Sequence, residues 1–193
     1  MGEAEVARVV AQVGELVGRP PARDGEMVAR RLEVLAEGED VDADALDVIF
    51  AARPDVLNHN LETVARLQRT ARPSAHYFRS LALLARAKDA GLVTKSGIIL
   101  GMGEEWDEIL TAMRDLRRSD VNILTLGQYL RPTDGHLPVV RFYTPAEFEE
   151  LRDAGLAMGF THVQASPLTR SSYHAWEQAK AAGAGAPENE GIS

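Results

Sequence analysis

Apolar positions along the chain follow two spacings, which together predict helices separated by short strands. Residues 3–17 place apolar side chains at helical intervals on one face, and residues 106–118 repeat that pattern. Residues 98–100 form a short apolar run of the kind that is buried on both faces of a parallel sheet. Further strands are predicted over 56–60, 121–127 and 161–165, and further helices over 45–52, 62–68, 75–90 and 145–158.

Three of the predicted helices are preceded by capping signals. Thr144 and Glu147 have the spacing of a capping box, in which each side chain bonds the other residue's backbone. Asp44 and Ser74 are predicted to cap the helices that begin just after them. These residues predict where the three helices begin.

The alternation of strands and helices is typical of βαβ units, and therefore of a parallel sheet. Residues 27–35 fit a helix or a short strand, so four or five strands are expected, too few for a closed eight-stranded barrel. The predicted fold class is α/β, an incomplete TIM-like (β/α) barrel. We expect an N-terminal helical segment over 1–30, the barrel domain over 31–182, and a disordered tail over 183–193.

Composition narrows the classes of function. The chain has 193 residues, 45% of them hydrophobic, and a net charge of -8, which argues against non-specific binding of nucleic acid or anionic membranes. No apolar run reaches the roughly 18 residues needed to cross a bilayer, and the N-terminus lacks the basic start of a signal peptide. We therefore expect a cytoplasmic protein. The absence of cysteine excludes disulfides and all-cysteine iron–sulfur sites within this chain.

The segment 94–104, with the sequence TKSGIILGMGE, carries the strongest candidate chemistry. Its apolar strand is followed by Gly101 and Gly103, which allow a neighbouring group to approach the backbone closely, and then by Glu104. Ligands bind at the carboxyl ends of strands in parallel α/β folds, so this loop is a candidate site. Polar clusters whose amides and hydroxyls suit a nucleoside also follow the other strands, at 58–63, 127–130 and 166–174.

Some of these side chains have simpler interpretations. Asn58 and Asn60 can bond loop backbone, and His59 between them is expected to point to the other face of its strand. Lys95 can alternatively be the Schiff-base lysine of an aldolase-like barrel enzyme. Three histidines without metal-ligand spacing are assigned to surface or packing: His76, His136 and His162.

In chain order, the four polar clusters resemble the C-terminal two-thirds of lipoyl synthase, a radical S-adenosylmethionine (SAM) enzyme. The resemblance covers about residues 44–178. It is carried by RPDVLNHNLET at 53–63, the 94–104 segment, LGQYL at 126–130, HLPV at 136–139, TPAEF at 144–148 and RSSYHA at 170–175.

The resemblance implies a partial barrel of the radical SAM type that binds SAM and two 4Fe–4S clusters. In that family one cluster cleaves SAM to a 5′-deoxyadenosyl radical, which abstracts hydrogen from an octanoyl chain on a lipoyl carrier domain. The second cluster donates sulfur and is consumed. The implied process is lipoate biosynthesis, and the implied partner is an octanoylated lipoyl carrier domain.

The resemblance also implies roles for particular residues. The family motif Gly-x-Ile-x-Gly-x-x-Glu, which helps to hold adenosine, falls on residues 97–104. A serine that ligates the sulfur-donating cluster corresponds to Ser171 or Ser172, beside Arg170, and the choice between the two stays open. The residues predicted to bind the cofactor are Asn58, Asn60, Glu62, Lys95, Ser96, Gly97, Ile99, Gly101, Glu104, Gln128 and Leu130.

The chain departs from the family in lacking both of its cysteine triplets, Cys-x4-Cys-x5-Cys and Cys-x3-Cys-x2-Cys. A serine alone cannot hold a cluster, because an iron–sulfur site needs three or four soft ligands. We therefore expect no clusters, weak SAM binding at best, and no lipoyl synthase turnover from this chain, interpreted as a truncated member of the family. Two alternatives stay open: a non-catalytic paralogue that binds a lipoyl carrier domain or a synthase partner, and an unrelated barrel enzyme that uses Lys95.

Overall fold

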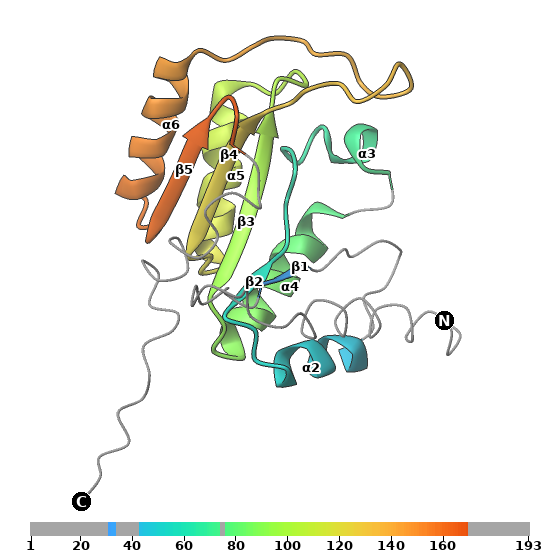
Figure 1. Cartoon of the computed structure of the whole chain (residues 1–193), viewed down its shortest axis with the longest axis vertical. Coiled ribbons are helices and arrows are strands. Elements are labelled where there is room, and N and C mark those ends of the chain that lie inside the picture. The colour runs from blue at the N-terminus through green and yellow to red at the C-terminus, as the bar shows by residue number, and fades with distance from the viewer. Residues whose placement is uncertain (1–30, 34–42, 74–75, 170–193) are drawn as a thin grey trace, which may run out of the picture.

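The computed structural model describes residues 31–33, 43–73 and 76–169, and within them a single parallel sheet of five strands (Figure 1). The strands follow one another across the sheet in chain order. The elements are β1 (Arg31–Glu33), α2 (Ala43–Ala51), β2 (Val56–Asn58), α3 (Gln68–Ala71), α4 (Tyr77–Asp89), β3 (Thr94–Leu100), α5 (Trp106–Arg118), β4 (Ile123–Gln128), α6 (Pro145–Ala157) and β5 (His162–Ser166).

The sheet is open, with β1 and β5 at its two edges, and all four of its pairings are parallel. This topology confirms the predicted α/β fold of an incomplete barrel. The ambiguous range 27–35 contains the short strand β1. The N-terminal helical segment predicted over 1–30 and the tail predicted over 183–193 lie outside the described residues.

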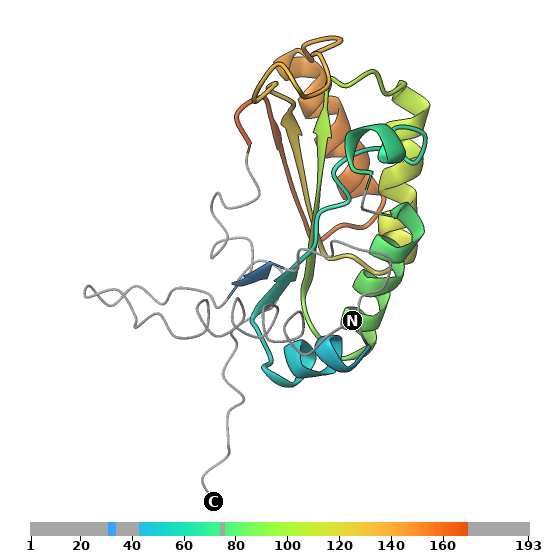
Figure 2. The same ribbon diagram turned by 90° about the vertical axis from the view of Figure 1, so that its right-hand side faces the viewer.

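The helices α4 and α5 run along the same face of the sheet (Figure 2). Ile98 and Leu100 of β3 point to that face, where they share the main hydrophobic core with Met113 of α5. Because successive strand residues point to opposite faces, Gly97 and Ile99 belong to the other face. The inner face of the open barrel is therefore the face to which Gly97 and Ile99 belong.

The capping box predicted at the start of α6 is confirmed. The Thr144 hydroxyl accepts a hydrogen bond from the backbone N–H of Glu147 (3.3 Å), and the Glu147 carboxylate accepts one from the N–H of Thr144 (2.8 Å). An equivalent box, made by Glu105 and Glu108, opens α5 and was not predicted. Both boxes satisfy backbone donors that a helix start leaves without partners.

The prediction of a helix over 62–68 is wrong, because the backbone of its first residue pairs with the sheet. The N–H of Glu62 donates to the carbonyl of Gly97 (2.9 Å), and the N–H of Ile99 donates to the carbonyl of Glu62 (2.8 Å). Glu62 thus forms a parallel bridge beside β3, and the helix α3 begins only at Gln68. A backbone group that is engaged in the sheet cannot also form a helical bond.

Two predicted helix starts also need correction. The helix α2 begins at Ala43, so Asp44 lies within its first turn and not at the cap. The residue at the N-cap of α4 is His76, which makes no side-chain capping bond. Ser74, the predicted cap, lies outside the described residues. Among the helices described, none combines the length and the apolar character needed to cross a membrane.

Candidate functional site

A cavity of about 500 Å³ lies at the carboxyl ends of the strands, between α3 and the β4–α6 loop (residues 131–143). Figure 1 shows this loop extending from the end of β4 toward α3 before it returns to α6. The carboxyl end of a parallel sheet is where ligands bind in such folds. The cavity is lined by Glu62, Thr70, Ala71, Arg72, Pro73, Ile99, Met102, Tyr129, Pro132, Gly135, His136 and Leu137.

The cavity has an apolar wall and a few polar groups. Ile99 comes from β3, Met102 from the loop after it, and Tyr129 from the end of β4. Glu62 and Arg72 contribute opposite charges from the segment between β2 and α4. An apolar pocket with a small number of placed polar groups is typical of sites for small organic ligands.

Glu62 has a backbone conformation that a non-glycine residue seldom adopts, with φ at 71°. Its carboxylate accepts a hydrogen bond from the Asn60 side chain (3.2 Å), and the Asn60 carboxamide oxygen accepts one from Asn58 (3.3 Å). Strained residues of this kind cluster at functional sites. Three residues that the sequence predicted as cofactor contacts therefore form one connected group at the end of β2.

Gly97 allows that group to lie against β3. A Cβ atom at this position would meet the Thr125 hydroxyl at 2.8 Å and the Asn60 carboxamide oxygen at 3.0 Å. Contacts this short force a neighbour to move. The glycine in the strand motif is thus explained by the close approach of Asn60 from the neighbouring segment.

The Glu104 carboxylate holds the loop between β3 and α5. It is 5% exposed and accepts hydrogen bonds from the backbone N–H groups of Gly101 (2.5 Å) and Met102 (3.0 Å). These bonds fix the loop that presents Met102 to the cavity. Direct contact between Glu104 and a cofactor stays a prediction.

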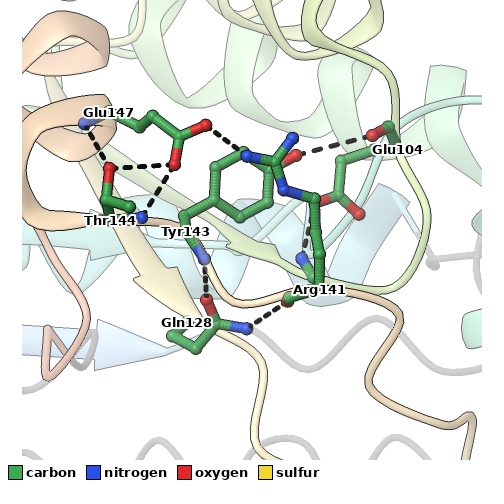
Figure 3. A network of polar contacts seen from close by, with 7 residues as sticks. Glu104, Gln128, Arg141, Tyr143, Thr144 and Glu147 are labelled. Carbon is green, nitrogen blue, oxygen red and sulfur yellow. Dashed lines mark hydrogen bonds and ion pairs between the residues drawn. The ribbon is translucent and has the colours of Figure 1, made fainter.

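Gln128 fastens the β4–α6 loop to the sheet (Figure 3). Its amide nitrogen donates to the carbonyls of Tyr129 (3.2 Å) and Arg141 (3.1 Å), and its oxygen accepts from the N–H of Tyr143 (3.0 Å). The Tyr129 hydroxyl donates to the carbonyl of Leu137 (2.9 Å), which binds the loop at a second point. Gln128 therefore shapes one wall of the cavity, and its contact with a cofactor stays a prediction.

Tyr143 anchors the end of this loop beside α6. Burial, and then the nearby Glu104 carboxylate, raise the pKa of its hydroxyl, so it remains a donor, and it reaches the carbonyl of Glu104 at 3.5 Å. The guanidinium of Arg141 lies 4.1 Å from the centre of the Tyr143 ring and pairs with Glu147 (Figure 3). The loop is thus tied to the capping box of α6.

Arg66 ties the segment after β2 to α5. Its guanidinium donates to both carboxylate oxygens of Glu108 (2.7 and 2.8 Å) and to the carbonyl of Gly103 (2.8 Å). The hydrogen bond from Arg66 is the main cause that lowers the pKa of Glu108 to about 2. A bidentate ion pair therefore joins the segment after β2 to the first turn of α5.

Of the eleven predicted cofactor residues, only Glu62 and Ile99 line the cavity. Lys95, Ser96, Gly101 and Leu130 lie elsewhere. The Ser96 hydroxyl accepts from the N–H of Leu61 (3.1 Å), which makes it a backbone brace on the helix-facing side. Lys95 is only 1% exposed and lies in the sheet between Asn58 and Ile123. Gly101 donates its N–H to Glu104, and Leu130 is 51% exposed. Neither residue lines the cavity.

Lys95 is buried and is not among the residues that line the cavity, so the structure adds no support to a Schiff-base enzyme. His59 points to the helix-facing side, as predicted, and bonds the Ser80 hydroxyl (2.9 Å). The predicted cluster ligands Ser171 and Ser172, with Arg170, lie outside the described residues.

The structure adds cavity residues that sequence reasoning missed, notably Arg72, Met102, Tyr129 and His136. His136 lies on the exposed loop, in agreement with its surface assignment, yet it also lines the cavity. No role was predicted for Arg72. Its role follows from the fold of the chain around α3, which no local spacing indicates.

The residues present do not fit a 4Fe–4S cluster. The sequence has no cysteine, and the described residues contain no group of three or more His, Asp or Glu side chains placed to hold a metal ion. Such a cluster needs several soft ligands. The cavity instead offers apolar surface and hydrogen-bonding groups, which suit an organic ligand such as a nucleoside.

Comparison with known proteins shows the family of the chain. Residues 9–116 match the model of the radical SAM superfamily. The chain is 54% identical to the lipoyl synthase of Rubrobacter xylanophilus over 157 residues, which are 80% of this chain and 49% of that enzyme. It is 57% identical to the lipoyl synthase of Hydrogenovibrio crunogenus over 138 residues, which are 70% of this chain and 44% of that enzyme.

Among solved structures, Streptococcus suis SuiB bound to S-adenosylmethionine aligns with a TM-score of 0.56 at 11% identity, over 70% of this chain and 32% of SuiB. This likeness shows a shared fold. The chain spans about half the length of the curated relatives it matches. By its sequence and its open parallel sheet, the chain belongs to the radical SAM superfamily and is similar to lipoyl synthases over most of its length.

Proposed function

We propose that this chain forms the adenosine-facing half of the SAM site in a lipoyl synthase-like protein. The observation that carries the proposal is the cavity at the carboxyl ends of the strands, where an apolar wall faces a strained carboxylate. The adenine base would lie against Ile99, Met102 and Tyr129. Glu62 would accept hydrogen bonds from the ribose hydroxyls, a role that carboxylates have in other nucleotide-binding folds.

Other predicted cofactor residues support the site in different ways. Gly97 gives Asn60 room beside β3, and Glu104 and Gln128 hold the two loops that shape the cavity. Direct cofactor contacts by Lys95, Ser96, Gly101 and Leu130 stay predictions, as do the domain boundaries near residues 30 and 182.

Complete lipoyl synthases insert sulfur into a protein-bound octanoyl chain. We propose that this is the process to which the chain is related. Bound SAM and its cluster would supply the radical chemistry, and an octanoylated lipoyl carrier domain would be the partner in the cytoplasm. The cluster ligands are cysteines that this sequence lacks. We therefore propose that this chain alone does not carry turnover.

The same lack of cysteine favours a second candidate, a non-catalytic paralogue that binds a lipoyl carrier domain. The two candidates are separated by comparing the binding of SAM and 5′-deoxyadenosine with the binding of an octanoylated lipoyl carrier domain. Binding of the carrier domain without binding of either adenosine ligand would favour the second candidate.

Calorimetric titration with SAM and with 5′-deoxyadenosine tests the proposed site. We expect both ligands to bind with dissociation constants above the micromolar range, because the cluster that anchors SAM is missing. Glu62→Gln should weaken both, by about tenfold if one charge-assisted hydrogen bond is lost. Glu149→Gln, an equal change of charge on the exposed face of α6, should leave both unchanged. Absence of any binding at millimolar ligand would contradict the proposal.

A further inference from the structure

The charge distribution around the cavity is uneven. The chain as a whole is acidic, with a net charge of -8. Arg72 and His136 nevertheless face the same cavity from its two sides, Arg72 from the end of α3 and His136 from the β4–α6 loop. Neither group has a part in the adenosine contacts proposed above.

Arg72 is held in place by its backbone and by one bond of its guanidinium. Its N–H donates to the carbonyl of Gln68 (2.8 Å), and Nη1 donates to the carbonyl of Asn60 (3.3 Å). The side chain is half-buried, and no carboxylate of the described residues forms an ion pair with it. A guanidinium has five N–H donors, so most of its hydrogen-bonding capacity remains for a ligand.

His136 is oriented by its own loop. The Thr133 hydroxyl lies 2.8 Å from Nδ1 of the ring, which leaves Nε2 as the ring nitrogen for a ligand. Arg131 braces the loop from within, because its Nε donates to the carbonyl of His136 (3.0 Å) and it pairs with Asp134 (3.2 Å). The imidazole is therefore presented by an ordered turn.

A buried polar side chain, that of Gln68, lies on α3. Gln68 is 3% exposed, and neither its amide nitrogen nor its oxygen has a hydrogen-bond partner within the described part of the chain. Residues three and four positions apart share a helix face, which puts Gln68 on the side of Ala71 and Arg72. Buried polar groups without partners are uncommon and point to a missing water or ligand group.

We propose that the cavity contains an anion subsite between the end of α3 and the β4–α6 loop, in which Arg72 and His136 bind an anionic group carried by the adenosine-type ligand. This inference rests on the proposed function for the nucleoside part of the ligand. A cation that is partly withdrawn from water and lacks an acidic partner is stabilised by an incoming anion. Guanidinium groups bind carboxylates and phosphates in the same bidentate way, so the anion is the carboxylate of an amino acid part or a phosphate.

Matched pairs of ligands test the subsite. SAM is compared with 5′-methylthioadenosine, which lacks the carboxylate, and AMP is compared with adenosine, which lacks the phosphate. In Arg72→Ala, the affinity for the ligand that carries the carboxylate or the phosphate should fall about tenfold in at least one pair, while the ligand without that group binds as before. Arg72→Lys should retain part of the affinity, because it keeps the charge without the planar donors.

Arg69→Ala is the matched control. Arg69 lies on the exposed side of α3, and its substitution removes the same charge as Arg72→Ala. It should leave all four affinities unchanged. A loss for SAM alone identifies a carboxylate subsite, and a loss for AMP alone identifies a phosphate subsite. Equal losses for anionic and neutral ligands, or equal effects of Arg69→Ala, would overturn the subsite.

Failure of the proposed function gives a different result. If neither adenosine nor 5′-methylthioadenosine binds, the nucleoside site is wrong, and the subsite is then judged with inorganic phosphate and acetate alone. Binding of either anion that is lost in Arg72→Ala supports the subsite. Binding that is unchanged in that variant, or no binding, contradicts it.

Discussion

Gly101 shows how the site depends on single residues whose backbone other residues cannot adopt. Its φ is 121°, and a Cβ atom there would lie 2.7 Å from the carbonyl of Arg141 and would also collide with the amide of Gln128. Those two groups are the ones that fasten the β4–α6 loop. The glycine thus permits the β3–α5 loop and the β4–α6 loop to meet.

Gly101→Ala should therefore destabilise the protein by about 2–4 kcal/mol, since it combines backbone strain with a clash against backbone. The free energy of unfolding, measured by urea denaturation, checks this. Gly135→Ala is the control, because the nearest atom to a Cβ there is the Thr133 hydroxyl at 3.8 Å. Similar effects of the two substitutions would show that the loop junction adjusts freely.

Glu104 is a residue whose hydrogen-bond partners the sequence did not predict. The motif predicted that its carboxylate contacts a cofactor, and the structure places that carboxylate on two backbone N–H groups of its own loop. A sequence motif shows that a carboxylate is needed at a position. Which donors it meets is decided by the path of the loop.

Among the elements, α5 depends on an ion pair as well as on its apolar face. Its start and end were predicted correctly from hydrophobic spacing alone. Glu108 in its first turn serves two partners, since it caps the N–H of Glu105 (2.8 Å) and pairs with Arg66 from the segment after β2. The ion pair connects two parts of the chain that are far apart in sequence.

The stability of this connection should depend on pH. The pKa of Glu108 is about 2 in the folded protein, below its ordinary value of 4.5. The carboxylate therefore stabilises the fold fully above about pH 4.5, and this contribution is lost as pH falls toward 2. The difference in unfolding free energy between the wild type and Glu108→Gln should be largest above pH 4.5 and should shrink as pH falls.

Urea denaturation at several pH values between 2 and 7 measures that difference. Glu149→Gln, on the exposed face of α6, should change the free energy of unfolding little at any of these values. A difference for Glu108→Gln that stays constant between pH 7 and pH 2 would exclude the ion pair as its source.

At the scale of the molecule, the described residues form a cavity at the carboxyl ends of the strands and contain no group of three or more side chains placed to hold a metal ion. The chain covers about half of the lipoyl synthases it matches, and its sequence contains none of the cysteines that an iron–sulfur cluster requires. Both observations agree with the proposal that the described sheet supplies one side of a cofactor site.

Anaerobic reconstitution with iron and sulfide tests this at the scale of the molecule. We expect the purified chain to bind no stoichiometric iron or sulfide and to show no lipoyl synthase turnover with an octanoylated carrier domain, because cysteine ligands are absent. Iron and sulfide are quantified after removal of unbound reagents. A stoichiometric cluster would contradict the expectation and would point to oxygen and nitrogen ligands that no motif predicts.

Local patterns in the sequence were enough to predict the alternation of helices and strands, the capping box of α6, and the polar groups at the ends of the strands, because spacing and capping act between near neighbours. They failed at 62–68, where Glu62 bonds β3 instead of forming a helix. They also could not indicate that Arg72 and His136 share a cavity. Only the tertiary structure decided these points, because backbone pairing and cavity walls join segments that are distant along the chain.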